Sequence, residues 1–115
     1  MKISTLKDLL EADVLCGEES LEKDVHSACG SDMMSDVLAF VKDQAVLMTG
    51  LDNLQLIRTA EMMDMICIVF VRAKRPTPEM IEAAKESGIV LLATQKRMYE
   101  SCGILYTNGL TGAKL

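Results

Sequence analysis

Aromatic residues are scarce in this chain: among 115 residues there is no tryptophan, and there are only two tyrosines and two phenylalanines. Proteins that bind single-stranded nucleic acids stack the bases on aromatic side chains, so the scarcity argues against that role. The net charge of −5 also argues against general binding to nucleic acids, which are themselves negatively charged. We therefore expect no nucleic-acid partner.

Long apolar stretches are also missing. No stretch approaches the roughly 20 apolar residues that a membrane-spanning helix needs. The segment that begins at Met1 is amphipathic and lacks the pattern of a signal peptide. We expect a cytoplasmic location and no membrane partner.

The cysteines do not form the close pairs that are typical of metal sites. Iron–sulfur and zinc sites usually contain a pair such as Cys-x-x-Cys, because one turn must bring two thiolates to one metal. Cys16 and Cys29 are the closest pair here, thirteen residues apart, and Cys67 and Cys102 lie further along. We expect buried, reduced thiols and no cofactor. An iron–sulfur protein is the less favoured alternative.

Catalytic motifs are absent as well. His26 is the only histidine, so a catalytic Cys–His or Ser–His pair would depend on it. It lies on a predicted strand, and no Walker A or Gly-x-Gly-x-x-Gly motif is present. We therefore expect that the protein is not an enzyme.

What the chain does contain is a repeated unit of apolar strand and helix. Residues 65–71 form an unbroken apolar run, and Thr77-Pro78 is a strong signal for the start of a helix. Gly88 is a good end for that helix, and an apolar run at 89–93 then begins the unit again. Strands without polar alternation are buried on both faces, as in a covered, mostly parallel sheet.

The order of the elements predicts an α/β fold with three layers, helix–sheet–helix. We expect strands at residues 13–16, 25–29, 45–48, 65–71 and 90–93. We expect helices at residues 4–10, 52–63 and 77–87, one that Ser31 or Asp32 caps, and a last one that Thr94 caps and Asn108-Gly109 ends. The length fits a single domain, residues 1–115, with an ordered core over about 3–109 and a loose tail at 110–115.

Polar and basic residues gather where the predicted strands end and the helices begin. If the strands are parallel, these junctions meet at one edge of the sheet, where backbone N–H groups and helix dipoles favour anions. The candidate ligand-binding residues are Ser31, Asp32, Thr49, Gly50, Asn53, Arg72, Lys74, Arg75, Thr94 and Lys96. The alternative is that the hydroxyl groups only cap helices and the basic residues form a solvated rim.

The nine methionines exceed what one core readily absorbs. Neighbours on a helix point about 100° apart, so adjacent methionines such as Met62 and Met63 cannot all face the same core. Some of them should form an apolar surface. We therefore expect a homodimer or another protein partner.

Five short motifs in this order resemble the DRTGG domain. They are Ser31-Asp32-x-x-Ser35-Asp36, Thr49-Gly50, Ile57-Arg58-Thr59-Ala60-Glu61-Met62, Ile68-Val69-Phe70-Val71-Arg72-x-Lys74-Arg75-Pro76 and Glu100-x-Cys102-Gly103-x-Leu105-Tyr106. The resemblance extends over about residues 3–110. More closely, the chain resembles the short stand-alone DRTGG proteins that anaerobic bacteria encode near iron-only hydrogenase subunits.

The resemblance implies an α/β/α sandwich on a mixed, mostly parallel five-stranded sheet, similar to the N-terminal domains of HPr kinase and the Mur ligases. It also implies a non-catalytic regulatory module for a small anionic ligand or nucleotide. The alternative that it implies is an accessory interaction factor for an iron-only hydrogenase or a related redox complex. The chain departs from the family signature at Gly50-Leu51-Asp52-Asn53 and at Arg72-Ala73-Lys74, which replaces the Gly-Gly turn.

Overall fold

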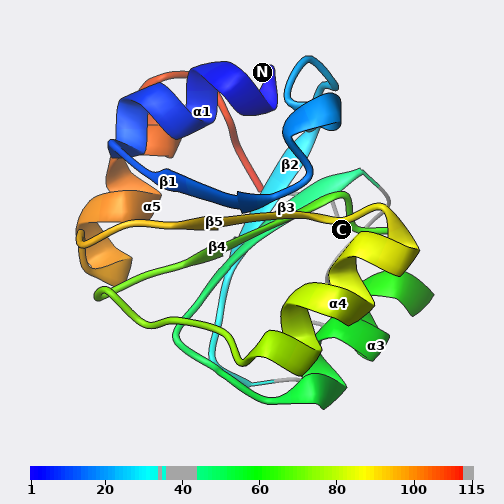
Figure 1. The fold of residues 1–115 in the computed structure, drawn as a ribbon. Helices are drawn as coiled ribbons and strands as arrows, with labels where there is room; N and C mark the ends of the chain where they lie inside the picture. The colour runs from blue at the N-terminus through cyan, green and yellow to red at the C-terminus, as the bar shows by residue number, and fades with distance from the viewer. Residues whose placement is uncertain (34, 36–43, 113–115) are drawn as a thin grey trace.

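Strands and helices alternate along the chain, in a computed structural model that describes residues 1–33, 35 and 44–112 (Figure 1). The five predicted strands are present as β1 (Asp13–Cys16), β2 (Ser27–Gly30), β3 (Ala45–Thr49), β4 (Cys67–Phe70) and β5 (Val90–Ala93). Four predicted helices are present as α1 (Ile3–Leu10), α3 (Leu54–Met62), α4 (Pro78–Ser87) and α5 (Met98–Thr107), and a short 3-10 helix, η1 (Glu18–Ser20), follows β1. The helix expected after Asp32 falls mainly outside the described residues. Within the described ranges, no helix has the length and hydrophobicity needed to cross a membrane.

The strands form a five-stranded sheet in the order β1-β5-β4-β3-β2. The strands from β2 to β5 are parallel to their neighbours, and β1 pairs antiparallel with β5 at one edge. All residues of β3, β4 and β5 are buried, which explains why their apolar runs show no polar alternation. The prediction of a mixed, mostly parallel sheet is confirmed.

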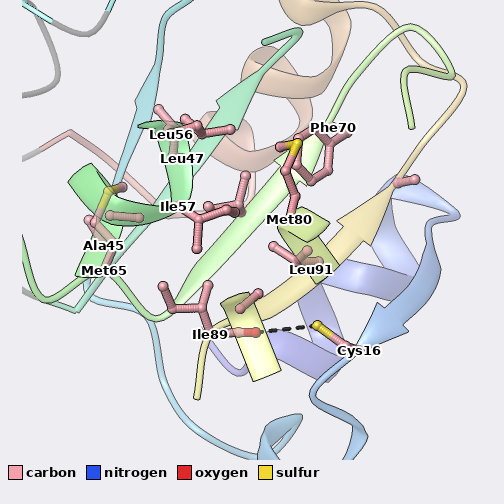
Figure 2. Packing of buried hydrophobic residues seen from close by; sticks show 14 residues of the cluster. Cys16, Ala45, Leu47, Leu56, Ile57, Met65, Phe70, Met80, Ile89 and Leu91 are labelled. Carbon is pink, nitrogen blue, oxygen red and sulfur yellow. Dashed lines mark hydrogen bonds between the residues drawn. The ribbon is translucent and has the colours of Figure 1, made fainter. Parts of the chain in front are cut away.

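Helices cover both faces of this sheet, which confirms the predicted three layers. Helices α1 and α5 lie on one face, and α3 and α4 lie on the other (Figure 1). Neighbouring residues of β4 serve the two faces in turn: Phe70 packs in the core below α3 and α4, and Val69 packs in the core below α1 and α5. Figure 2 shows the first core, where Ile57 and Met80 from the two helices lie beside Phe70 and Leu91.

The methionines at the end of α3 divide between the core and the surface. Met65 is buried, Met63 is partly buried, and Met62 is 69% exposed. Helical geometry turns each successive side chain by about 100°, which separates Met62 from Met63 at the end of α3, and Met65 reaches the core from the segment after the helix. The prediction that adjacent methionines cannot share one core is confirmed here, and Met33 is a second exposed one.

The strand β2 begins two residues later than predicted, after His26. The backbone N–H of Val25 donates to the carbonyl of Met1 at 2.8 Å, so this part of the chain pairs with the N-terminus. His26 donates its backbone N–H to the carbonyl of Gln44 at 3.0 Å, and the residue is exposed. The single histidine therefore lies outside the strand.

The first residues of the expected loose tail contact the body of the protein. Leu110 is 5% exposed and packs in the core below α1 and α5. The backbone N–H of Ala28 in β2 donates to the carbonyl of Thr111 at 3.1 Å. Because β2 is an edge strand, half of its backbone groups point away from the sheet, and the chain after α5 pairs with one of them. The expectation of a loose tail is therefore wrong for residues 110 and 111.

Candidate functional site

The carboxyl ends of β2, β3, β4 and β5 lie at one edge of the sheet, because these strands are parallel. The residues that follow them, at 31–33, 49–53, 71–77 and 94–97, share this edge as predicted. The antiparallel strand β1 begins there as well, since Asp13 pairs with Ala93 at the end of β5. The end of α1 is thereby brought to the same edge.

One acidic side chain, Asp32, joins the loop after β2 to the loop after β3. Its Oδ1 accepts hydrogen bonds from the backbone N–H of Gly50 at 2.6 Å and from the hydroxyl of Thr49 at 3.0 Å. Its Oδ2 lies 3.8 Å from Nη2 of Arg72. Thr49 is fully buried, whereas the side chains of Asp32 and Arg72 are each 48% exposed. We call these four residues the Asp32 cluster.

The turn after β4 carries Arg72 to this cluster. Arg72 and Ala73 both adopt the left-handed conformation, with φ values of 60° and 59°, which costs a non-glycine residue about 1–2 kcal/mol. Their backbone N–H groups donate to the carbonyls of Lys96 and Thr94, each at 2.9 Å. The guanidinium of Arg72 fills the space that a side chain on Gly50 would need. The DRTGG resemblance implies a Gly-Gly turn at this position, and here Arg72 and Ala73 adopt the left-handed conformation that glycine takes readily.

A cleft of about 450 Å³ lies beside the Asp32 cluster, at the carboxyl end of β5. It is lined by residues from the end of α1, the start of β1, the turn after β4 and the start of α5. We call it the Arg75–Lys96 cleft. Its charged residues are Glu11, Asp13, Arg75, Lys96 and Glu100.

Acidic residues that the sequence analysis missed neutralise the two cations of this cleft. Arg75 lies 3.2 Å from Asp13, and Lys96 lies 3.4 Å from Glu11 and 3.9 Å from Glu100. These carboxylates are largely exposed, so each pair contributes at most about 1 kcal/mol to stability. Glu11 and Asp13 reach this edge through the antiparallel pairing of β1, which the alternation of strands and helices does not indicate. Glu100 lies four residues after Lys96 on the start of α5.

The prediction that Thr94 caps the last helix is wrong. Helix α5 begins three residues later, with Arg97 at its N-cap position and no side-chain capping bond. The hydroxyl of Thr94 instead donates to the carbonyl of Leu10 at 2.7 Å and accepts from the backbone N–H of Lys96 at 3.2 Å. Thr94 is 2% exposed. Its hydrogen bond to Leu10 connects the end of α1 to the end of β5, and the hydroxyl hydrogen of Thr94 therefore does not point into the cleft.

The other three predicted site residues serve local structure or remain solvated. Asn53 caps α3, since its Oδ1 accepts from the backbone N–H of Leu56 at 3.1 Å. The hydroxyl of Ser31 accepts from the backbone N–H of Met33 at 2.9 Å. Lys74 is exposed at the same edge and makes no ion pair in the part of the chain that the structure describes. The edge thus combines ligand-accessible groups with ordinary helix caps.

Comparison with known proteins is decisive for the family. The family model of the DRTGG domain matches residues 5–107. The chain belongs to the DRTGG domain family. A search of curated proteins found no significant match.

The fold of this DRTGG domain also occurs in a solved structure. That structure contains the CBS and DRTGG domains of the regulatory region of a Clostridium perfringens pyrophosphatase, complexed with its activator, diadenosine tetraphosphate. The TM-score is 0.72, the sequence identity is 16%, and 90% of this chain is covered. The match spans 45% of that chain. At this identity the likeness shows the shared fold.

The cysteines of this DRTGG domain occupy core or partly covered positions. Burial raises the pKa of the Cys67 thiol strongly, and it also raises the pKa of Cys16 and Cys102. The thiol of Cys16 donates to the carbonyl of Ile89 at 3.6 Å (Figure 2). Raised pKa values disfavour the thiolate that metals and electrophiles need. Over the described ranges, no group of three His, Cys, Asp or Glu residues is placed to hold a metal ion. The expectation of no cofactor stays a prediction.

Proposed function

We propose that this protein is a regulatory module that binds a small anionic ligand, and we name a nucleotide as the ligand class. Membership in the DRTGG family supports a regulatory role. The related regulatory region was solved with a nucleotide activator, which supports a nucleotide as the first ligand to test. Such a module acts by changing the behaviour of a partner when the ligand binds.

The observation that carries the proposal is the convergence of two polar features at one sheet edge. The Asp32 cluster supplies a backbone N–H, a hydroxyl and a guanidinium. The Arg75–Lys96 cleft adds a volume of about 450 Å³, which lies within the range of about 300–1,000 Å³ that is typical of small-molecule sites. The two are neighbours, since Arg72 donates its backbone N–H to the carbonyl of Lys96.

We include a non-catalytic role and a cytoplasmic location in the proposal. Catalysis by a nucleophile needs a hydroxyl or thiol beside a general base. At this edge the Thr94 hydroxyl donates to a backbone carbonyl, and the Thr49 hydroxyl, which donates to Asp32, is fully buried and so closed to a substrate. His26 precedes β2, away from the carboxyl ends of the strands. Burial of Cys16 and Cys67 fits the reduced thiols of the cytoplasm.

The proposal is tested by thermal denaturation with diadenosine tetraphosphate, ATP and inorganic phosphate. A ligand present at 100 times its dissociation constant should add about 2.7 kcal/mol to the free energy of unfolding. The R72A variant should lose this stabilisation, because it removes the guanidinium from the edge. The K23A variant is the control, since Lys23 is an exposed cation that precedes β2 at the opposite edge.

Two results would contradict the proposed site. One is a stabilisation that survives in R72A at full size. The other is an equal loss in R72A and K23A, which would reflect general charge and not a defined site. The absence of any stabilisation by the three ligands would count against the nucleotide class itself.

A second candidate function is an accessory interaction factor, as a homodimer or with a hydrogenase or other redox subunit. The observation that favours it is on α5, where Tyr99 is 93% exposed and Tyr106 is 65% exposed. These residues are seven positions apart and so lie on the same face of the helix. Exposed tyrosines are enriched at protein interfaces.

Light scattering after size exclusion tests this second candidate. If α5 forms a homodimer contact, the native protein should elute as a dimer and the Y99S/Y106S variant as a monomer. The Y99F/Y106F variant, which keeps the rings, should remain a dimer. A native monomer would remove the homodimer, and co-purification with a purified hydrogenase subunit would then test the other partner.

A further inference from the structure

We infer that Asp32 is a built-in occupant of an anion site and that a phosphoryl group of the bound ligand displaces it. The site consists of the Gly50 backbone N–H, the Thr49 hydroxyl and the Arg72 guanidinium. The inference rests on the proposed function, because it assigns the point at which an anionic ligand enters. It gives Asp32 the role of a competitor and not of a ligand-binding residue.

The donors of this site require an acceptor at all times. Thr49 is 0% exposed and Gly50 is buried, so water has little access to replace a lost partner. A buried donor that is left without an acceptor costs about 1–3 kcal/mol. In this structure one oxygen, Oδ1 of Asp32, accepts from both donors, at 3.0 and 2.6 Å. A phosphoryl oxygen is likewise a negatively charged acceptor and can take the same charge-assisted hydrogen bonds.

The resident carboxylate is held in a way that permits exchange. The side chain of Asp32 is 48% exposed, and its contact with Arg72 is long, at 3.8 Å. Arg72 is equally exposed, and such a pair contributes little to stability. Rotation of the Asp32 side chain therefore opens the site, while the buried donors stay fixed by the end of β3.

Gly50 leaves room for the Arg72 guanidinium beside the two neutral donors. The guanidinium of Arg72 lies where a Cβ on residue 50 would stand. A larger residue would push Arg72 away from the Thr49 and Gly50 donors. The absence of a side chain thus lets one cation and two neutral donors point at the same small volume.

A loop clamp is the alternative role for Asp32, and it leads to opposite expectations. A clamp would stabilise the protein and add nothing to anion exclusion. A competitor, when removed, leaves donors that bind an added anion. Phosphate binding to Asp32 variants separates the two roles.

The experiment is a titration of D32A with inorganic phosphate at fixed ionic strength, followed by the amide signals of Gly50 and Leu51 in NMR spectra. We expect D32A to bind phosphate at least tenfold more tightly than the native protein. The D32A/R72A variant should lose this gain. The matched control is D64N, which removes one exposed negative charge before β4 and keeps a residue type that tolerates its φ of 54°.

The inference is overturned if D32A binds phosphate no better than the native protein, or if D64N shows the same gain. If D32A does not fold, D32N provides the same test, because its amide oxygen keeps the acceptor and removes only the charge. D32N should show a smaller gain in the same direction, and no gain would also overturn the inference.

The result is distinguishable from failure of the proposed function. If the native protein binds a nucleotide but D32A binds phosphate no more tightly, the proposed function stands and the competitor role of Asp32 is rejected. If D32A binds phosphate more tightly but the native protein binds no nucleotide, the competitor role of Asp32 stands and the nucleotide is rejected as the ligand class.

Discussion

Two buried threonines, Thr49 at the end of β3 and Thr94 after β5, have the same local geometry. Each hydroxyl accepts a hydrogen bond from the backbone N–H two residues later, Leu51 at 3.1 Å and Lys96 at 3.2 Å. Both residues are almost fully buried, at 0% and 2% exposure. In each case the bond turns the chain away from the sheet edge.

The two threonines differ in the group that accepts their own hydroxyl proton. Thr49 donates to the side chain of Asp32, which is half exposed. Thr94 donates to the backbone carbonyl of Leu10, the last residue of α1. A surface carboxylate can rotate away, whereas a carbonyl at the end of a packed helix moves only with the helix. The β3 end is therefore suited to exchange with a ligand, and the β5 end is suited to fastening α1.

The largest effect that follows from this comparison is a loss of stability in T94V. The substitution leaves the Leu10 carbonyl without its donor and the Lys96 N–H without its acceptor. We expect the free energy of unfolding to fall by about 2 kcal/mol, which lowers the melting temperature by about 8 °C. T94S should recover most of the loss because it keeps the hydroxyl. Phosphate binding by the D32A/T94V variant should match that of D32A. A large loss of phosphate binding in that variant would contradict the separate roles of Thr49 and Thr94.

T49V should affect ligand binding more than it affects the stability of the fold. T49V removes the acceptor of the Leu51 N–H, as T94V does for Lys96, but the half-exposed Asp32 carboxylate can accept from water in place of the lost hydroxyl while it keeps the Gly50 N–H. We therefore expect a loss of only about 1 kcal/mol in the free energy of unfolding. Ligand stabilisation should disappear, because one of the three donors is gone. Urea denaturation with and without diadenosine tetraphosphate measures both the loss of stability and the stabilisation by the ligand. A loss of stability greater than that of T94V would contradict the comparison.

The smallest effect concerns the turn that links the two ends. Relief of the left-handed strain at Ala73 is worth about 1–2 kcal/mol, but glycine costs about 0.4–1 kcal/mol in the unfolded chain. We expect A73G to raise the free energy of unfolding by a net amount of about 0.5 kcal/mol, measured by urea denaturation. A83G, inside α4, is the control and should lose up to about 1 kcal/mol. Destabilisation by A73G would mean that the alanine side chain packs in this turn.

Much of the fold is readable from local signals along the chain. Residues 65–71 have no polar alternation, and this pattern predicts a strand that is covered on both faces. Thr77-Pro78 and Gly88 mark the ends of α4 within one residue, because capping depends on the first and last turns alone. The parallel arrangement then follows from the alternation of strands and helices, and with it the edge that gathers the candidate residues.

The sequence predicts the position of each candidate site residue at the sheet edge better than it predicts the hydrogen bonds or ion pairs that the residue makes. A threonine before a helix looks the same whether it caps that helix or bonds to a distant carbonyl, so the sequence predicts a cap at Thr94 that the structure does not contain. Glu11 and Asp13 gave no signal, because they reach the edge only through the antiparallel pairing of β1 with β5. Asn53 behaved as its local sequence indicates, as a helix cap.

The sequence by itself determined the element order, the buried strands and the edge at which polar residues meet, because hydrophobic period and capping act over a few residues. Tertiary structure alone decided that Arg75 pairs with Asp13 and Lys96 with Glu11, where the Thr94 hydroxyl points and why Arg72 and Ala73 tolerate a left-handed turn. Those outcomes depend on hydrogen bonds between segments far apart in the chain, such as Thr94 with Leu10 and Arg72 with Lys96. Partners at such separations are fixed by the packing of the whole sheet, and no local pattern carries them.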